Sequence, residues 1–417
     1  GSEMCIRDRF ALEVRAGMIE PLVVEDEQCV VAVVGEGMRE RPGLAARLFR
    51  VLGQRGINVR AIAQGSSERN LSLVLARRDE TRALRAIHES VFRPDDSILK
   101  LVLLGVGGVG SALLDQLGER LAELVALGVE LRLCGLATSR HMALDAGGLT
   151  LPADEPGRAW LEQHGEPSSL ERLASFLEEL DGPRALIDCT ATPWAAELYR
   201  RLLERRISVV AANKVAFAGP LDDDPRRRGP YDGYGVYYET TVGAGLPVLR
   251  TVQDLVRTGD RLRRIEGLFS GTLTYLASRL REGEAFSAAV AEAHRLGYTE
   301  PDPRVDLGGL DVARKLVILA REAGADLELG AVDVEPLIDT SWLDLPLDEF
   351  WRRLPELDEP FARHAERCRT EGLALAYLAR LELEDPEGPR ASVSLVELDP
   401  AHPCAAARGT DNSFALY

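Results

Sequence analysis

The sequence predicts an α/β protein made of a small α+β domain, a doubly wound parallel sheet and a further mixed α+β domain. Two observations lead to this fold class. Apolar, β-branched runs alternate with amphipathic stretches between residues 98 and 241, which is typical of a parallel sheet covered by helices. The chain has 417 residues, about three times an ordinary domain length, and 46% of them are apolar. We therefore expect two or three domains with buried cores.

The first part, residues 29–96, predicts a small α+β sandwich. We exclude residues 1–9 as a non-native scar and expect 10–28 to be a linker. The predicted order is strand, helix, strand, strand, helix, and the elements are 29–36, 41–56, 57–65, 71–78 and 79–92.

The second part, residues 97–245, predicts the doubly wound sheet. Its expected strands are 98–104, 131–137, 185–190, 207–213 and 235–241, with helices at 111–128 and from Pro193. In the third part, residues 246–400, we expect a helix at 245–259 and a strand at 263–271. Three helical stretches follow, and then two strands at 373–383 and 391–398. We expect 401–417 to be a truncated return toward the second part.

Charge and composition exclude several functions. The net charge of −17 argues against a nucleic-acid or anionic-membrane surface. No apolar run approaches the roughly 20 residues of a membrane helix. The six cysteines and six histidines are scattered, which disfavours a zinc site and is typical of a reducing cytoplasm.

A glycine-rich turn at 105–110 follows the first strand of the second part. GVGGVG between a buried strand and a helix is the arrangement that binds a dinucleotide. Gly105 permits the tight turn, Gly107 admits the pyrophosphate, and Gly110 lets helix and strand pack closely. We therefore expect a Rossmann-type nucleotide-binding domain rather than a purely structural turn.

The end of the next strand indicates which nucleotide binds. The acidic residue that would bind a ribose hydroxyl is missing from LATSRH at 136–141, and Arg140 stands there instead, close to Thr138. A cation near that position suits a 2′-phosphate, so NADP is favoured over NAD. The alternative is that Arg140 is one more solvated arginine.

The densest polar cluster lies at 298–320, YTEPDPRVDLGGLDVARKLVILA. Two prolines are expected to keep its first part extended and to present Glu300 and Asp306. Asp311 and Lys315 are four residues apart, on a helix with apolar residues on most sides. A surface ion pair is the simpler interpretation. We favour a buried site, because a lysine in apolar surroundings has a lowered pKa and exchanges protons near neutral pH.

Lysine is rare in this chain: of 50 basic residues only Lys100, Lys214 and Lys315 are lysine. Loop lysines are ordinarily solvated. Lys214, however, follows an apolar strand at the sheet edge where ligands bind, and a compact amine can transfer a proton where a guanidinium cannot. We expect Lys214 and Lys315 to share one site, and Lys100 to be incidental.

The turn ETTVGAGLP at 239–247 combines Glu239 with two glycines and a proline. A carboxylate with several backbone carbonyls could hold a hard cation. A simple crossover turn between domains is the interpretation that the residues alone favour.

Taken together, these segments resemble homoserine dehydrogenase over residues 97–417. The likeness rests on GVGGVG, DCT at 188–190, ANK at 212–214, TVGAGLP at 241–247, FSGTLTYL at 269–276 and LGYTEPDPRVDLGGLDVARK at 296–315. RERPGLAARLF and NVRAIAQGSSERN, at 39–49 and 58–70, resemble an ACT domain, and 10–24 resembles the end of a preceding ACT repeat. This layout is similar to the C-terminal part of a bifunctional aspartokinase/homoserine dehydrogenase, without the kinase domain.

The resemblance implies NADP-dependent interconversion of L-aspartate 4-semialdehyde and L-homoserine in threonine and methionine biosynthesis. It implies a substrate and dimerisation domain after the nucleotide domain, and hence a homo-oligomer. By this analogy Lys315 is the proton donor and Lys214 assists near the nicotinamide. The remaining implied roles are substrate binding by Glu300, Asp306 and Asp311; cofactor contacts by Val106, Gly108, Val109, Thr138 and Thr190; a sodium site of Glu239, Val242, Ala244 and Leu246; and threonine regulation near Asn58 and Gln64.

Two alternatives remain open. The chain could be a catalytically inactive regulatory fragment that binds an amino acid, or a Rossmann dehydrogenase that acts on another carbonyl compound.

Overall fold

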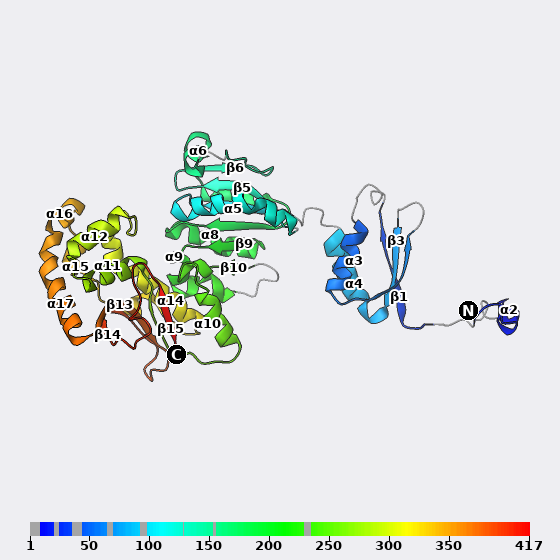
Figure 1. Cartoon of the computed structure of the whole chain (residues 1–417). Helices are drawn as coiled ribbons and strands as arrows, with labels where there is room; N and C mark the ends of the chain where they lie inside the picture. Colours follow the sequence, from blue (N-terminus) through cyan, green and yellow to red (C-terminus); the bar gives the residue numbers. More distant parts are fainter. Residues whose placement is uncertain are drawn as a thin grey trace. The chain divides into compact units, whose positions relative to one another are not determined.

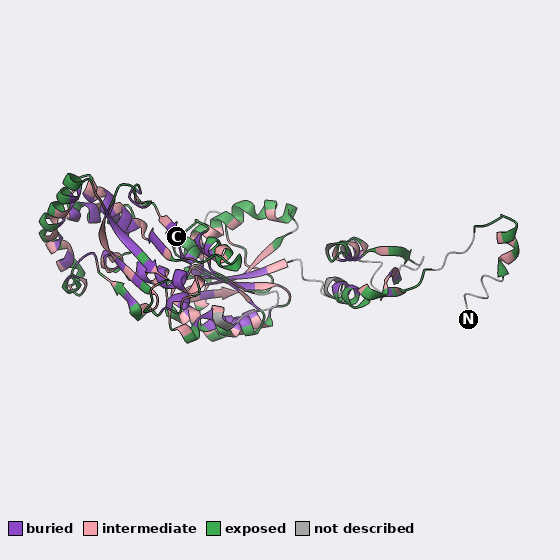
Figure 2. Ribbon diagram, turned by 90° about the horizontal axis from the view of Figure 1, so that it is seen from below, coloured by how far each residue is buried: buried purple, intermediate pink, exposed green. Residues whose placement is uncertain are grey.

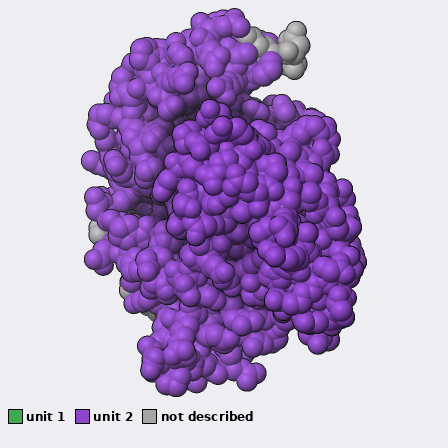
Figure 3. Space-filling view, turned by 90° about the vertical axis from the view of Figure 1, so that its left-hand side faces the viewer, with its two compact units in different colours: residues 1–97 green, residues 98–417 purple. Residues whose placement is uncertain are grey.

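The computed structural model describes residues 9–20, 25–35, 44–64, 70–91, 98–127, 129–152, 156–228 and 235–417. The chain divides into two compact units, residues 1–97 and 98–417 (Figure 1). The larger unit is one continuous body (Figure 3). The turn that carries RERPG and the segment that follows Gln64 lie outside the described residues.

The first unit contains a three-stranded antiparallel sheet with two helices packed on one face (Figure 1). The strand order is β1-β3-β2. Leu71, Leu73 and Leu75 alternate along β3 and are buried with Leu48 and Leu52 of α3. This confirms the predicted order of elements, which are β1 (Gln28–Val34), α3 (Leu44–Gln54), β2 (Val59–Gln64), β3 (Asn70–Ala76) and α4 (Glu80–Val91), preceded by the short α2 (Ala11–Arg15).

The second unit begins with a seven-stranded sheet in the order β10-β9-β8-β4-β5-β6-β7. β4 lies between β5 and β8 and is parallel to both. β5 and β8 lie on opposite sides of β4, so the direction in which strands are added to the sheet reverses at β4. Sheets of this kind bind ligands beside the carboxyl ends of the strands where this reversal occurs. The strands are β4 (Ile98–Leu104), β5 (Glu130–Ala137), β6 (His141–Leu144), β7 (Glu166–Pro167), β8 (Arg184–Asp188), β9 (Ser208–Ala211) and β10 (Val236–Tyr237).

Helices cover this sheet as the alternating pattern predicts. The short β10 gives way at once to a 3-10 turn at Glu239–Thr241, so the strand expected at 235–241 is much shorter than predicted. The helices are α5 (Gly108–Ala126), α6 (Gly157–His164), α7 (Leu170–Glu179), α8 (Pro193–Glu204) and α9 (Val215–Ala218).

Two strands of this sheet differ from the parallel arrangement predicted from the sequence. β6 is antiparallel to β5, and β7 is antiparallel to β6. The cause is a tight turn: the Thr138 backbone N–H donates to the His141 carbonyl at 2.8 Å, and the Thr138 hydroxyl accepts from the His141 N–H at 3.1 Å. A side chain that bonds to its own backbone two or three residues on reverses the chain here.

The remainder of the second unit is a mixed five-stranded sheet in the order β12-β14-β13-β11-β15. Helices α11, α14 and α17 contact β13. The last strand pairs antiparallel with β11, with Leu416 opposite Ile265, so residues 413–416 belong to this sheet although we expected a return toward the nucleotide domain. The strands are β11 (Arg264–Leu268), β12 (Val332–Val334), β13 (Ala374–Glu382), β14 (Arg390–Leu398) and β15 (Ser413–Leu416).

More helices precede β13 in this part of the chain than the four predicted, which were one before β11 and three after it. They are α10 (Val248–Arg257), α11 (Gly271–Arg281), α12 (Phe286–Arg295), α13 (Pro303–Leu307), α14 (Leu310–Glu322), α15 (Thr340–Leu343), α16 (Leu347–Arg353) and α17 (Asp358–Glu371). The expectation that prolines keep 301–306 extended is wrong. Pro303 occupies the first turn of α13 behind the capping side chain of Asp302, a position where proline favours a helix.

Helix α14 lies in the core of the second unit. As predicted, its apolar residues Val312, Leu316, Val317, Ile318 and Leu319 are buried. Buried residues follow the strands and the inward faces of the helices across this unit (Figure 2).

Gly110 is a place where the packing of α5 on β4 can be tested. A Cβ atom added there would lie 1.9 Å from the Gly105 carbonyl oxygen, whereas one added at Gly118 in the same helix would meet nothing within 4 Å. We expect Gly110→Ala to lower the free energy of unfolding by about 3 kcal/mol. Gly118→Ala should raise it by about 1 kcal/mol, because alanine favours helix. Urea denaturation followed by circular dichroism measures both, and equal effects would contradict the close approach.

Candidate active site

The turn between β4 and α5 forms a cradle of backbone. Gly105 has a positive φ of 93°, and a Cβ there would lie 2.8 Å from the Cys189 carbonyl carbon, so only glycine fits. By contrast, Cβ atoms at Gly107 and Gly108 would meet nothing within 4 Å. No side chain caps the start of α5. Free N–H groups and the positive end of a long helix thus face open space, which suits a pyrophosphate.

The two valines of the motif differ in exposure. Val106 is buried in the core between sheet and helices, and Val109 is exposed on the first turn of α5. Val109 is thus placed on the open side of the cradle, whereas Val106 supports the turn from beneath.

Thr138 and Arg140 lie in the turn that ends β5, next to β4 in the sheet. The Thr138 hydroxyl is occupied within the turn by the backbone of Arg140 and His141. Arg140 is exposed, and its guanidinium forms no ion pair with any of the described residues. The structure therefore leaves Arg140 available to an anionic group, while Thr138 shapes the turn.

A buried carboxylate that the sequence did not single out ties together the loops after β8 and β9. Asp188 is fully buried and accepts hydrogen bonds from the Tyr199 hydroxyl at 2.7 Å, the Asn213 amide at 3.0 Å and the Thr190 backbone N–H at 2.8 Å. Burial and the Asp188 charge raise the pKa of Tyr199, so its hydroxyl stays a donor. Asn213 also donates to the Thr190 hydroxyl at 3.2 Å. Thr190 and Lys214 are thereby held at one sheet edge.

Lys214, Asp311 and Lys315 meet in one ion cluster. One Asp311 oxygen lies 3.3 Å from Lys214 Nζ and the other 2.7 Å from Lys315 Nζ. Lys315 also donates to the Phe269 carbonyl at 2.6 Å, and 14% of its side chain is exposed. Burial raises the pKa of the Asp311 carboxyl, but the two ammonium groups outweigh burial and hold it below its usual value. The two lysines come together from segments about one hundred residues apart.

A second acidic group lies beside this cluster. Asp306 accepts from the Glu300 backbone N–H at 2.8 Å and from the Thr272 hydroxyl at 3.4 Å. Burial, together with the negative charges of Glu300 and Asp311, raises the pKa of Asp306 to about 6, although the N–H bond opposes the shift. The Glu300 side chain is exposed. The region carries an excess of negative charge that a cationic ligand would relieve.

Glu239 has a local structural role. Its two carboxylate oxygens accept from the backbone N–H groups of Leu249 and Arg250, each at 3.0 Å, and so cap α10. The Leu246 carbonyl accepts from the Val248 N–H at 2.9 Å. Each carboxylate oxygen keeps a further lone pair, so the residue types of this turn still fit an oxygen-coordinated cation.

The proposed regulatory residues lie in the first unit. Asn58 precedes β2 and Gln64 ends it, and both are exposed.

Among the described residues, none of the helices has the length and apolar character required to cross a membrane.

Comparisons with known proteins agree with this arrangement. A family model described as "Homoserine dehydrogenase, NAD binding domain" matches residues 105–226, one described as "Homoserine dehydrogenase" matches 247–417, and an ACT domain model matches 31–91. The bifunctional aspartokinase/homoserine dehydrogenase of Haemophilus influenzae is 38% identical over 417 residues, covering 99% of this chain and 50% of the relative. A chloroplastic counterpart from Zea mays is 39% identical over 416 residues, covering 98% of this chain and 44% of the relative.

Solved structures show the same fold. Homoserine dehydrogenase from Thermoplasma acidophilum has a TM-score of 0.57 and 23% identity, covering 76% of this chain and 89% of its own. A hyperthermophilic archaeal homoserine dehydrogenase in complex with NADPH has a TM-score of 0.56 and 21% identity, covering 76% and 88%.

The chain spans about half the length of the curated relatives it matches. Within that span all three expected domains are present: ACT, NAD-binding and dehydrogenase. The chain therefore carries the NAD-binding and dehydrogenase domains of the homoserine dehydrogenase family, with an ACT domain ahead of them.

Proposed function

We propose that this chain catalyses the NADP-dependent interconversion of L-aspartate 4-semialdehyde and L-homoserine. The observation that carries the proposal is the Lys214–Asp311–Lys315 cluster, which joins the nucleotide-binding sheet to the dehydrogenase domain. A series of contacts leads from the cradle to this cluster: Gly105 abuts Thr190, and Thr190 bonds to Asn213, the residue before Lys214.

The lysines supply what carbonyl reduction needs. Bound NADPH would provide the hydride. An ammonium group has three N–H donors, and Lys315 directs two of them to Asp311 and Phe269. The third is left for the substrate carbonyl oxygen, where Lys315 can donate a proton as negative charge develops. Lys214 adds positive charge beside the same oxygen.

The carboxylates suit the other end of the substrate. Glu300, Asp306 and Asp311 together place negative charge where the ammonium group of the amino acid would bind.

The aspartokinase reaction of the longer relatives needs a domain that these 417 residues do not include.

Finer expectations complete the proposal. The exposed Arg140 supports a preference for NADP, and Glu239 with the carbonyls of Val242, Ala244 and Leu246 supports a sodium ion. The ACT domain supports regulation by threonine near Asn58 and Gln64. We also propose a homo-oligomer in the cytoplasm.

One assay tests the central proposal. NADPH oxidation is followed after addition of aspartate semialdehyde, with and without threonine. Turnover that threonine inhibits is the expected result. No turnover together with threonine binding would favour the inactive regulatory fragment, and strong preference for another aldehyde would favour a different dehydrogenase.

Lys315→Arg tests the role of the lysine. The substitution retains the positive charge beside Asp311, but a guanidinium does not give up its proton near neutral pH. We expect kcat to fall by about 100-fold or more, with the Kd for NADPH nearly unchanged. Stopped-flow kinetics and fluorescence titration measure the two, and a near-normal kcat would rule out Lys315 as the proton donor.

Arg140→Ala tests cofactor choice. Removing the guanidinium should weaken NADPH binding, because the 2′-phosphate loses its cation, and should leave NADH binding almost unchanged. The ratio of the two Kd values reports the effect. Arg158→Ala, an exposed arginine whose ion pair lies within α6, is the matched control. Equal weakening of both cofactors by Arg140→Ala would contradict a 2′-phosphate contact.

Asp306 gives a pH dependence. Its pKa of about 6 means that the carboxyl is ionised above pH 6 and neutral below it. Because the ionised form attracts the substrate ammonium group, the KM for homoserine should rise as pH falls through 6. In Asp306→Asn the KM should lose this step and stay, above pH 6 as well, at the higher value that the wild type shows only below pH 6. A step of unchanged size in Asp306→Asn would assign it to another group.

A further inference from the structure

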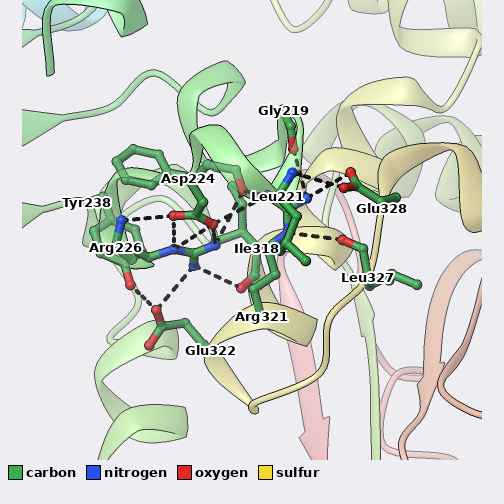
Figure 4. A network of polar contacts seen from close by, with 11 residues as sticks. Gly219, Leu221, Asp224, Arg226, Tyr238, Ile318, Arg321, Glu322, Leu327 and Glu328 are labelled. Carbon is green, nitrogen blue, oxygen red and sulfur yellow. Dashed lines mark hydrogen bonds and ion pairs between the residues drawn. The ribbon is translucent and has the colours of Figure 1, made fainter. Parts of the chain in front are cut away.

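Helix α14 carries a second polar cluster at its C-terminal end (Figure 4). Arg321 is almost fully buried, with 4% of its side chain exposed. Its guanidinium donates to the backbone carbonyls of Phe217 at 2.9 Å, Gly219 at 2.8 Å and Leu327 at 3.0 Å. Two of these carbonyls belong to the end of α9 and the residue just after it. Arg321 therefore fastens the end of α14 to the end of α9.

Asp224 lies at the centre of this cluster and is 2% exposed. It accepts from Arg321 at 3.3 Å and from Arg226, whose Nε lies 2.8 Å from Oδ1. Arg226 in turn donates to Glu322 at 3.2 Å and to the Ile318 carbonyl at 3.4 Å, both on α14. Burial lowers the pKa of Arg321, and the charge of Asp224 opposes that shift. Buried charges are thus paired across the two segments.

Two contacts enclose the cluster. The Leu221 backbone N–H donates to Glu328 at 2.9 Å, and the Tyr238 hydroxyl donates to Glu322. The Arg226 guanidinium also lies over the Tyr238 ring, 5.3 Å from its centre. Figure 4 shows these groups converging on Asp224 and Arg321 from both segments. We call this set of contacts the clamp; it joins residues 217–226 and Tyr238 to α14 and to residues 327–328 just after it.

The same two helices carry the ion cluster of the active site. Lys214 is the residue before α9, and Asp311 lies in the first turn of α14. The Phe217 carbonyl, which accepts from both Arg226 and Arg321, follows Lys214 by three residues. α9 has only four residues, and a helix of one turn has no stability of its own. Its placement must come from tertiary contacts.

We infer that Asp224 and Arg321 are positioning residues, which fix α9 against α14 and thereby hold Lys214 within reach of Asp311. The effect on catalysis rests on the proposed function; the effect on the position of Lys214 does not. Within the described part of the chain, no hydrogen bond or ion pair joins Asp224 or Arg321 to the residues that would bind substrate, so the clamp acts through Lys214.

Because the chain has only three lysines, amine labelling reports directly on Lys214. The full chain is treated briefly with acetic anhydride, and the modification of each lysine is measured by mass spectrometry. In Arg321→Met we expect Lys214 to be labelled several-fold faster than in the wild type, relative to the buried Lys100 as internal reference. Arg295→Met, which removes an exposed ion pair on α12, is the matched control and should leave the ratio unchanged.

An unchanged ratio in folded Arg321→Met overturns the inference. If that variant does not fold, Glu328→Ala replaces it, because the Glu328 side chain is 53% exposed and its loss removes only the outer contacts of the clamp. A smaller rise in Lys214 labelling is then expected, and no rise overturns the inference.

A double-mutant cycle separates positioning from simple stabilisation. Arg321→Met should lower kcat by about 10-fold to 100-fold without changing the KM for NADPH, because the glycine cradle lies elsewhere. In a Lys214→Ala background, the same substitution should have no further effect on kcat. Additive effects would contradict action through Lys214. A wild-type chain without activity would count against the proposed function, and the labelling ratio would then decide the positioning role.

Discussion

The carboxylate of Asp311 binds two ammonium groups, those of Lys214 and Lys315, which belong to elements packed in different sheets of the second unit. Lys214 follows a strand of the seven-stranded sheet, and Lys315 lies on a helix packed against the five-stranded sheet. Without Asp311 between them, two like charges this close would repel one another. The carboxylate is itself kept ionised by the lysines against the effect of burial. Each member of the cluster therefore depends on the other two.

Much of the fold is predictable because it follows from local patterns. Strands β4, β5, β8 and β9 are apolar runs, and α5 and α14 have helical spacing, so neighbouring residues specify them. The strands at His141–Leu144 and Glu166–Pro167 were not predicted, because β6 depends on hydroxyl bonds within a four-residue turn and β7 on pairing with β6. Pro303 was misplaced since the capping role of Asp302 was not recognised.

The candidate site was predicted in part. The scarcity of lysine pointed to Lys214 and Lys315, and their shared contact with Asp311 agrees with that signal. Asp188 and the clamp gave no such signal. Asp188 gathers partners from two later segments, and Arg321 bonds to carbonyls about one hundred residues away. Only the folded chain brings these groups together. Because arginine is abundant in this chain, the sequence alone did not distinguish Arg226 and Arg321 from arginines at the surface.

Helix α14 carries an ion cluster toward one end and the clamp at the other, and this constrains its length. Arg321 follows Lys315 by six positions, a rise of about 9 Å along the helix. Inserting or deleting one residue between them would turn one end relative to the other by about 100°. The lysine and the arginine would then face different neighbours, even if every side chain type were retained. The number of residues in this stretch is therefore fixed by the contacts at its two ends, in addition to the packing of its buried apolar side chains.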